Sequence, residues 1–189
     1  MNQLPTLKNL KLWGCSNCDL CSKCGRCQSN KHVLSHCSSP EALARYFDRH
    51  NKILKLIGNW IKPKMNSTAN VYYDLTIPGT RHISDLFNGV RPDLAIVNSS
   101  RIDICELTVC HETNLESSRK YKLNKYSNIS SRRSCLVENH TVNVYTIEIS
   151  VLGFVIVDPN FLQQRGLASF SNALLTEITK TAVLASHDI

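Results

Sequence analysis

Two short β-rich runs, each ending at a carboxylate, restrict the fold of this chain more than any other feature. Residues 94–97 and 102–105 are rich in apolar and β-branched side chains, and the polar break between them is typical of a hairpin. A turn centred on the middle of this break would place Asp93 directly opposite Glu106, with Cβ atoms roughly 4.5–5.5 Å apart. The sequence therefore predicts a sheet that carries two facing acids.

Both acids are expected at the ends of apolar stripes. Side chains alternate along a strand, so Glu106 shares a face with Ile102 and Ile104, and Asp93 shares one with Ala95. Facing like charges destabilise a sheet unless a cation lies between them, and a hard divalent ion suits oxygen ligands. Removing either acid is then expected to leave the metal-free protein equally stable or more stable. The alternative is an exposed acid pair at a sheet edge, with the register displaced by one.

A helix is expected to bring a lysine to the same region. Thr113 and Glu116 form a capping-box pattern, so the helix is predicted to begin there and to run to about Ile129. At about 100° per residue, Lys122 lies near the middle of the apolar stripe that Leu115 marks. A core-facing lysine is costly unless it meets a carboxylate or a phosphate, so a contact with the acids is expected.

Two neighbouring lysines make this prediction specific. Lys120 points well away from the apolar stripe, whereas Lys125 lies one turn further along at the margin of the stripe. Lys122 is thus the candidate for a catalytic contact, with Lys125 beside it. The alternative is that Lys122 bends along its aliphatic stem toward solvent.

A cysteine-dense segment precedes these elements. The chain has nine cysteines and no recognisable secretory signal, which favours metal ligation or reduced thiols over a disulfide scaffold. His32 and Cys37 are separated by four residues, as in a zinc knuckle, and cysteines recur at every third position from 15 to 27. Pairs at 15/18, 18/21, 21/24 and 24/27 are all available, and knuckle spacing selects Cys24 and Cys27. A metal-free or redox-active loop is the alternative.

The charge distribution favours a polyanionic partner. The net charge is +7, and residues 1–64 hold eleven Lys and Arg against three acids, while residues 119–133 hold six with none. The basic side chains expected to contact nucleic acid are Arg49, His50, Arg119, Arg132 and Arg133. A solvated helix face explains the first two equally well, and a basic protein without such a partner is the general alternative.

The rest of the chain has an α/β pattern. Ser39 and Pro40 begin a helix with apolar residues at helical spacing, and residues 62–67 end it as a linker. Further strands are expected at 71–76 and at 142–150 continuing to 157, and a closing helix at 171–185. No stretch approaches ~20 uninterrupted apolar residues, and no signal segment is recognisable. We therefore expect an intracellular protein that is not secreted and does not enter a membrane.

The order of these elements resembles the restriction-like endonuclease domain of site-specific non-LTR retrotransposons. That domain is a variant of the PD-(D/E)xK nuclease fold in which the lysine has moved from the strand to the following helix, and Thr108 stands here at the usual strand position. The resemblance rests on Asp93…Glu106 followed by Lys122-x-x-Lys125-Tyr126, and upstream on Arg45-Tyr46, Arg49-His50-Asn51 and the cysteine-dense segment.

The resemblance implies a fold, a domain division and a set of zinc ligands. The implied fold is an α/β restriction-endonuclease-like core, with a central mixed sheet flanked by helices, and a small N-terminal zinc-knuckle module. The division is 1–38 for the zinc module, 39–64 for a connecting helix and linker, and 65–189 for the endonuclease domain. The family spacing selects Cys21, Cys24, His32 and Cys37 as ligands of a structural zinc, with Cys18 and Cys27 as alternative cysteines.

The implied activity is nicking of target DNA by phosphodiester hydrolysis. Asp93 and Glu106 would hold Mg²⁺ or Mn²⁺, Lys122 would orient water or stabilise the transition state, and Lys125 would assist or grip the backbone. DNA is the implied partner, with RNA as a further partner at the zinc knuckle, and the implied location is nuclear or intracellular. A decayed, non-cleaving nucleic-acid-binding zinc protein is the main alternative, and a zinc-dependent protein-interaction domain is a third.

Overall fold

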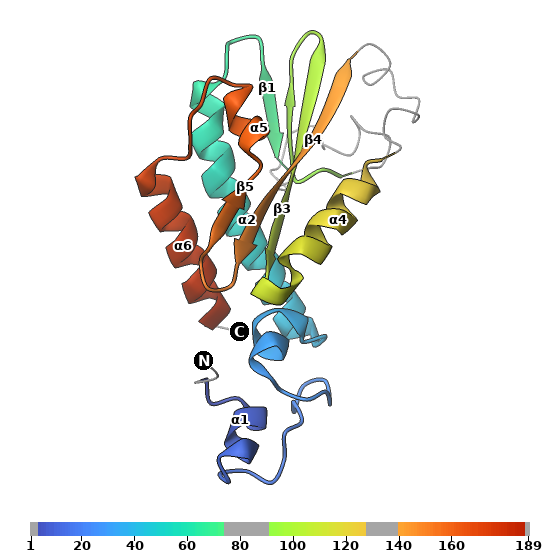
Figure 1. The fold of residues 1–189 in the computed structure, drawn as a ribbon, viewed down its shortest axis with the longest axis vertical. Helices are drawn as coiled ribbons and strands as arrows, with labels where there is room; N and C mark the ends of the chain where they lie inside the picture. Colours follow the sequence, from blue (N-terminus) through green and yellow to red (C-terminus); the bar gives the residue numbers. More distant parts are fainter. Residues whose placement is uncertain (1–3, 74–90, 128–139, 188–189) are drawn as a thin grey trace.

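A five-stranded mixed sheet flanked by helices forms the centre of the protein (Figure 1). The computed structural model describes residues 4–73, 91–127 and 140–187. The strands lie in the order β1 (Asn70–Tyr73), β2 (Leu94–Val97), β3 (Arg101–Cys110), β4 (Thr141–Ser150) and β5 (Val155–Val157). β3 and β4 run parallel, and the other neighbours run antiparallel. The expected α/β class with a central mixed sheet is confirmed.

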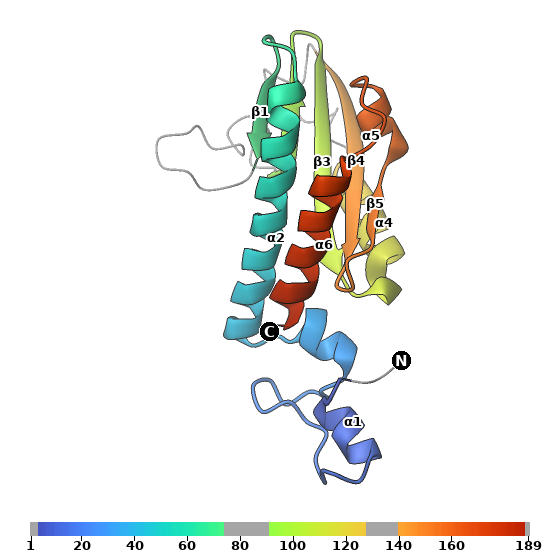
Figure 2. The ribbon, with the colours of Figure 1, turned by 90° about the vertical axis from the view of Figure 1, so that its left-hand side faces the viewer.

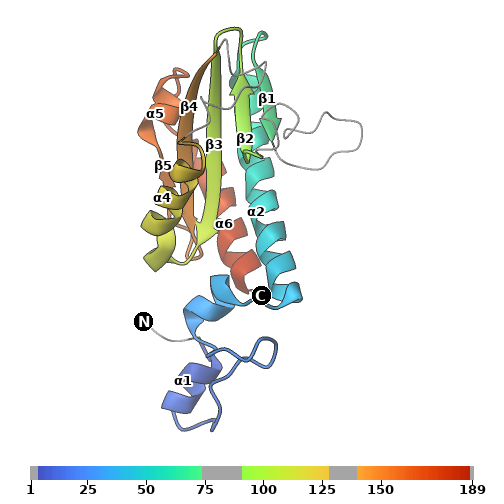
Figure 3. The same cartoon turned by 90° about the vertical axis from the view of Figure 1, so that its right-hand side faces the viewer.

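Helices cover both faces of the sheet. α2 (Pro40–Ile61) and α6 (Asn172–His187) lie side by side on one face (Figure 2). α4 (Leu115–Lys125) lies on the opposite face (Figure 3), and the short α5 (Pro159–Gln163) follows β5. The main core lies under α2 and α6, where Ile53, Ile147 and Ile178 are at most 1% exposed. None of the helices in the described residues combines the length and apolarity that crossing a membrane requires.

The hairpin of β2 and β3 has the predicted register. Leu94 pairs with Cys105, so Asp93, which precedes β2, stands opposite Glu106. Both acids lie at the end of an apolar stripe on the α4 side of the sheet. In this stripe, Ala95 and Ile104 are fully buried and belong to a second apolar cluster. Asp93 is 9% exposed and Glu106 is fully buried, so the alternative of an exposed pair at a sheet edge is wrong.

The start of α2 is also as predicted. The Ser39 hydroxyl accepts a hydrogen bond from the Ala42 amide at 3.3 Å, and Pro40 is the first helical residue. Pro40 suits that position because its missing N–H would have no partner within the helix. A single 3₁₀ turn, Lys62–Lys64, follows the helix, where the linker was expected.

Three predicted boundaries need correction. Glu112–Asn114 form a 3₁₀ turn, with His111 capping it, and the α-helix begins only at Leu115, so Thr113 is not its cap. α4 ends at Lys125, with Tyr126 as its C-cap, so it does not run to Ile129. The end of the strand predicted at 71–76 lies outside the described residues. The strand expected to continue through 157 is broken by a turn at 151–154, in which Gly153 has φ +90°, and β5 folds back on β4. A positive φ favours glycine, which is why the chain can reverse there.

The N-terminal residues form a small module below the sheet, at the N-terminal end of α2 (Figure 1). It contains α1 (Leu7–Leu12) and the π-helical turn η1 (His32–His36). Arg49 fastens this module to the core, because its guanidinium donates to the Leu34 and Val109 carbonyls at 3.0 and 3.4 Å and to the Ser186 hydroxyl. Arg49 is 1% exposed, so the expectation that it faces the DNA backbone is wrong.

Candidate functional site

The two facing acids are held in place by backbone amides. The Asp93 N–H donates to Glu106 Oε1 at 3.2 Å, and the Leu107 N–H donates to Asp93 Oδ2 at 2.8 Å. Each carboxylate is therefore fixed by the strand that carries the other. We call Asp93, Glu106 and the side chains that contact them the acidic site.

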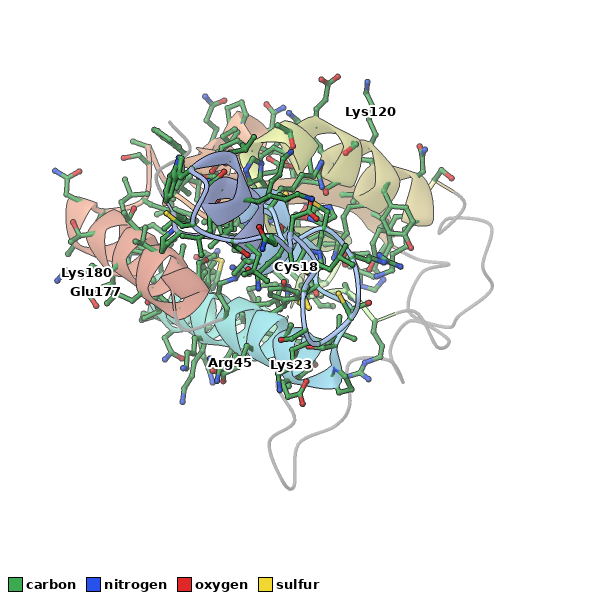
Figure 4. The ribbon with its side chains drawn as sticks, turned by 90° about the horizontal axis from the view of Figure 1, so that it is seen from below. Cys18, Lys23, Arg45, Lys120, Glu177 and Lys180 are labelled. Carbon is green, nitrogen blue, oxygen red and sulfur yellow. The ribbon has the colours of Figure 1, made fainter. Side chains whose placement is uncertain are left out.

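Lys122 of α4 lies between the two acids. Its Nζ donates to Asp93 Oδ2 at 3.0 Å and to Glu106 Oε2 at 2.6 Å. Lys125 lies beside it, 3.5 Å from Glu106 Oε1, and donates to the Arg91 carbonyl at 3.1 Å. Lys120 instead pairs with Glu116 at 2.7 Å and projects from the outer side of α4 (Figure 4). The helical phase predicted from the sequence is confirmed, and the alternative in which Lys122 bends to solvent is wrong.

Two further side chains belong to the acidic site, and neither was assigned a role there from the sequence. The Tyr126 hydroxyl donates to Glu106 Oε1 at 2.5 Å, and Tyr126 is 2% exposed. His50 Nε2 lies 3.5 Å from Asp93 Oδ2, so His50 faces the acid and not, as expected, the DNA backbone. Both positions could have been found by helical spacing, because His50 precedes the buried Ile53 by one turn and Tyr126 follows Lys122 by one turn.

Burial and neighbouring charges shift the pKa values of Asp93, His50 and Lys122 in opposite directions. Burial raises the pKa of Asp93, but the hydrogen bond and charge of His50 and the charge of Lys122 outweigh it and lower the pKa to about 2. Burial lowers the pKa of His50, but Asp93 outweighs it, so the net shift is upward. The pKa of Lys122 is likewise lowered by burial and raised more strongly by Asp93 and Glu106. The Asp93 carboxylate and the Lys122 ammonium are therefore both charged near neutral pH.

The donor set of the acidic site suits a hard cation. Asp93 Oδ2 and Glu106 Oε2 both lie within 3.0 Å of one ammonium nitrogen, so the two oxygens already share a single positive charge. Divalent ions such as Mg²⁺ prefer carboxylate oxygens of this kind. Asp93 and Glu106 are thus the residues that could hold such an ion.

A second cluster, in the N-terminal module, suits a softer metal. The ligand atoms of Cys21, Cys24, His32 and Cys37 all lie within 4.8 Å of one another, and three of these residues are buried. We call these four residues the cysteine cluster. Three thiols and one imidazole are a donor set of the kind that holds structural zinc. Burial, with the nearby charges of Arg26 and His36, lowers the pKa of His32, which favours the neutral imidazole that metal ligation needs.

The structure also favours one of the two candidate ligand registers. Cys27, which knuckle spacing would select, is exposed and lies 3.9 Å from an Asp19 carboxylate oxygen. Cys18 is exposed on the same module (Figure 4). His36 points away from the cluster, with its Nε2 2.7 Å from Asn114 Nδ2 at the start of α4. The register implied by the family spacing is the one that brings four ligands together.

The remaining side chains predicted to contact nucleic acid are Arg119, Arg132 and Arg133. Arg119 is half-exposed, and its guanidinium nitrogens lie 3.9 Å from Glu148 Oε1 and 3.7 Å from Asp158 Oδ2. Its charge is thus shared with two carboxylates, and a contact with DNA stays a prediction. Arg132 and Arg133 lie outside the described residues.

Neither the protein-family models nor the curated proteins supply a relative from which a role could be transferred. Comparison with protein-family models gave no match, and a search of the curated proteins gave no significant similarity. The geometry of the acidic site and of the cysteine cluster is therefore the basis for a functional interpretation.

Proposed function

We propose that this protein is a metal-dependent DNA endonuclease of the PD-(D/E)xK type, with a zinc-binding module at its N-terminus. The observation that carries the proposal is the contact of Lys122 with both Asp93 and Glu106, at 3.0 and 2.6 Å. Two acids and a lysine converge from a hairpin and the following helix, which is the constellation that a phosphodiester-hydrolysing site requires. The resemblance to the retrotransposon endonuclease domain supports the same function, including a lysine carried by the helix.

The proposed roles follow from the position of each side chain. Asp93 and Glu106 would hold Mg²⁺ or Mn²⁺, which supplies a polarised water and neutralises charge on the scissile phosphate. Lys122, released to the phosphate, would stabilise the extra negative charge of the transition state. Lys125 is fixed by the Arg91 carbonyl at the edge of the acidic site, where it would contact the DNA backbone. Tyr126 would keep Glu106 in one orientation.

DNA is the partner that the charge of the chain favours. A net charge of +7 attracts a polyanion, and binding through Lys and Arg releases counterions from phosphates. The cysteine cluster would hold zinc in a structural role, since its four ligands leave no open position. The proposed domain division stays at 1–38, 39–64 and 65–189.

A cleavage assay on supercoiled plasmid tests the proposal. Wild-type protein with Mg²⁺ or Mn²⁺ is expected to convert the plasmid to the nicked form, and Asp93→Ala, Glu106→Ala and Lys122→Ala should each abolish nicking while DNA binding is retained. Lys120→Ala is the matched control on the outer side of the same helix and should cleave normally. DNA binding without cleavage under either metal would instead support the non-cleaving nucleic-acid-binding protein.

A further inference from the structure

The ammonium of Lys122 lies where a divalent ion would have to bind. It is 3.0 Å from Asp93 Oδ2 and 2.6 Å from Glu106 Oε2, and its side chain is 22% exposed. Divalent ions contact carboxylate oxygens at about 2.0–2.6 Å. An ion shared by these two oxygens would therefore overlap the ammonium group, and the two cations would also repel each other strongly at that separation.

We propose that Lys122 is an internal counter-ion that must leave the acidic site before a divalent metal can bind there. This inference rests on the proposed nuclease function and adds a regulatory step to it. Metal loading is then an exchange of one cation for another, not the filling of a preformed site. Lys122 blocks metal binding while its ammonium lies between the two acids. Once displaced, the same ammonium can assist catalysis.

The acids themselves are anchored independently of Lys122. Glu106 Oε1 is held by the Tyr126 hydroxyl and by the Asp93 N–H, at 2.5 and 3.2 Å. Asp93 Oδ2 is held by the Leu107 N–H at 2.8 Å and faces His50. Both carboxylates would therefore stay in position when the ammonium leaves, so the exchange requires movement of one flexible side chain.

A hollow beside the acidic site can accept the displaced Lys122 ammonium. It has a volume of about 310 Å³ and is lined by Lys122 itself together with Thr108, Ser117, Ser118 and Tyr121. Four hydroxyl groups can accept hydrogen bonds from an ammonium, and the four-carbon stem of lysine has the freedom to rotate into the hollow. The hollow also opens to solvent beside the exposed Tyr121, where a phosphate could meet the displaced ammonium.

The exchange predicts a weak apparent affinity for the metal. If the state with Lys122 displaced makes up about 1–10% of the protein, the apparent metal affinity falls to that same fraction of its intrinsic value, so removing the ammonium should tighten binding about 10- to 100-fold. Lys122→Met keeps the aliphatic stem and removes the charge. Lys125→Met is the matched control, because it removes a charge 3.5 Å from Glu106 that does not lie between the two acids.

The test is titration of the full-length, zinc-loaded protein with Mn²⁺. Electron paramagnetic resonance measures the concentration of free Mn²⁺ at each point of the titration. Lys122→Met is expected to bind Mn²⁺ at least tenfold more tightly than wild type, and Lys125→Met no more than a few-fold more tightly. Asp93→Asn should lose this binding and defines the signal that belongs to the acidic site. Lys122→Gln is a second variant, should Lys122→Met fold poorly, and should also bind more tightly than wild type.

The outcomes separate this inference from the proposed function. Equal Mn²⁺ affinity of wild type, Lys122→Met and Lys122→Gln would overturn the exchange while leaving a nuclease metal site intact. Equal tightening by Lys122→Met and Lys125→Met would also overturn it, because general charge removal would then explain the effect. Absence of any binding that depends on Asp93, in every variant, would overturn both the exchange and the proposed metal site.

Discussion

The cysteine cluster and the acidic site both gather metal-binding side chains, but they are built from the chain in different ways. The four ligands of the cysteine cluster come from one segment, residues 21–37, which is shaped by local hydrogen bonds such as Cys21 N–H to the Arg26 carbonyl at 2.7 Å. The acidic site combines α2, the β2–β3 hairpin and α4, which are far apart in sequence. The geometry of the cysteine cluster therefore depends on one loop, whereas the geometry of the acidic site depends on the whole fold.

The two regions also differ in how charge is balanced before a metal arrives. Thiols can be neutral, so the cysteine cluster can form without a counter-charge. Buried carboxylates cannot remain unpaired at low cost, and Lys122 and Lys125 supply the positive charge that the acidic site needs. A metal in the cysteine cluster therefore adds a new interaction, whereas a metal in the acidic site replaces an existing one. Substitutions in the two regions are therefore expected to differ in their effects on metal content, stability and activity.

The largest effect is expected for loss of Cys37, a proposed zinc ligand. Zinc binding to such sites is coupled to folding and is worth on the order of 10 kcal/mol, so Cys37→Ser should release the metal and unfold the N-terminal module. The sheet and its helices should remain folded, because their core lies elsewhere. Elemental analysis and hydrogen exchange would measure both effects.

Cys27→Ser is the matched control for this prediction. Cys27 is exposed and lies outside the cysteine cluster, so the zinc content should stay at about one ion per chain. Loss of zinc in Cys27→Ser, with retention in Cys21→Ser, would show that the knuckle register is the correct one.

The next effect is the stability of Asp93→Ala, for which the structure reverses the expectation from the sequence. Repulsion between facing acids predicts equal or greater stability after the substitution. In the structure, however, Asp93 accepts hydrogen bonds from Leu107 N–H and Lys122, and faces His50. Breaking a buried ion pair by removing one partner costs roughly 3–5 kcal/mol, so Asp93→Ala should be destabilised without added divalent metal. Urea denaturation at pH 7 gives the free energy of unfolding, and an increase would restore the repulsion argument.

A smaller effect is expected for Tyr126→Phe. The substitution keeps the buried ring and removes one hydrogen bond to a charged acceptor, which contributes roughly 1.5–3 kcal/mol. Nicking should slow about tenfold or more, since 1.4 kcal/mol corresponds to a factor of ten in rate. Tyr121→Phe, at an exposed position of the same helix, is the control and should unfold at the same temperature as wild type. Full nicking activity in Tyr126→Phe would show that Glu106 is held without the hydroxyl.

The smallest effect is the pH dependence of the contact between His50 and Asp93. The pKa of His50 is raised above its usual 6.5 in the folded protein, so this contact stabilises folding fully below about pH 6.5 and progressively less as pH rises through the folded-state pKa. The difference in unfolding free energy between wild type and His50→Gln should therefore be larger at pH 6 than at pH 9. A difference that grows with pH would contradict the ion pair.

Some elements of the fold could be predicted from the sequence by local rules of strand alternation, helical phase and capping. The β2–β3 register follows from the position of the turn, and the inward direction of Lys122 follows from helical phase. The start of α2 follows from Ser39 and Pro40. Each of these depends on residues close together in the sequence, where alternation and capping dominate.

Other features depend on contacts between distant segments. From the sequence, Arg49 is expected to face solvent or DNA. In the structure its partners are the Leu34 and Val109 carbonyls, which no local sequence pattern indicates. The role of Tyr126 likewise depends on the position of Glu106 in β3, a separate element that faces α4. The cysteine register was ambiguous because every third residue from 15 to 27 is a cysteine, and only the folded loop shows which thiols converge.

The most direct test of the acidic site is a crystal structure of the protein with bound Mn²⁺, with the ion located by its anomalous scattering. We predict one Mn²⁺ coordinated by both Asp93 and Glu106, with the Lys122 ammonium displaced from its position between the acids. The anchors of the acids, Tyr126 and Leu107, should keep their hydrogen bonds. Saturating Mn²⁺ that gives no anomalous peak between Asp93 and Glu106, with Lys122 still bridging them, would contradict the account.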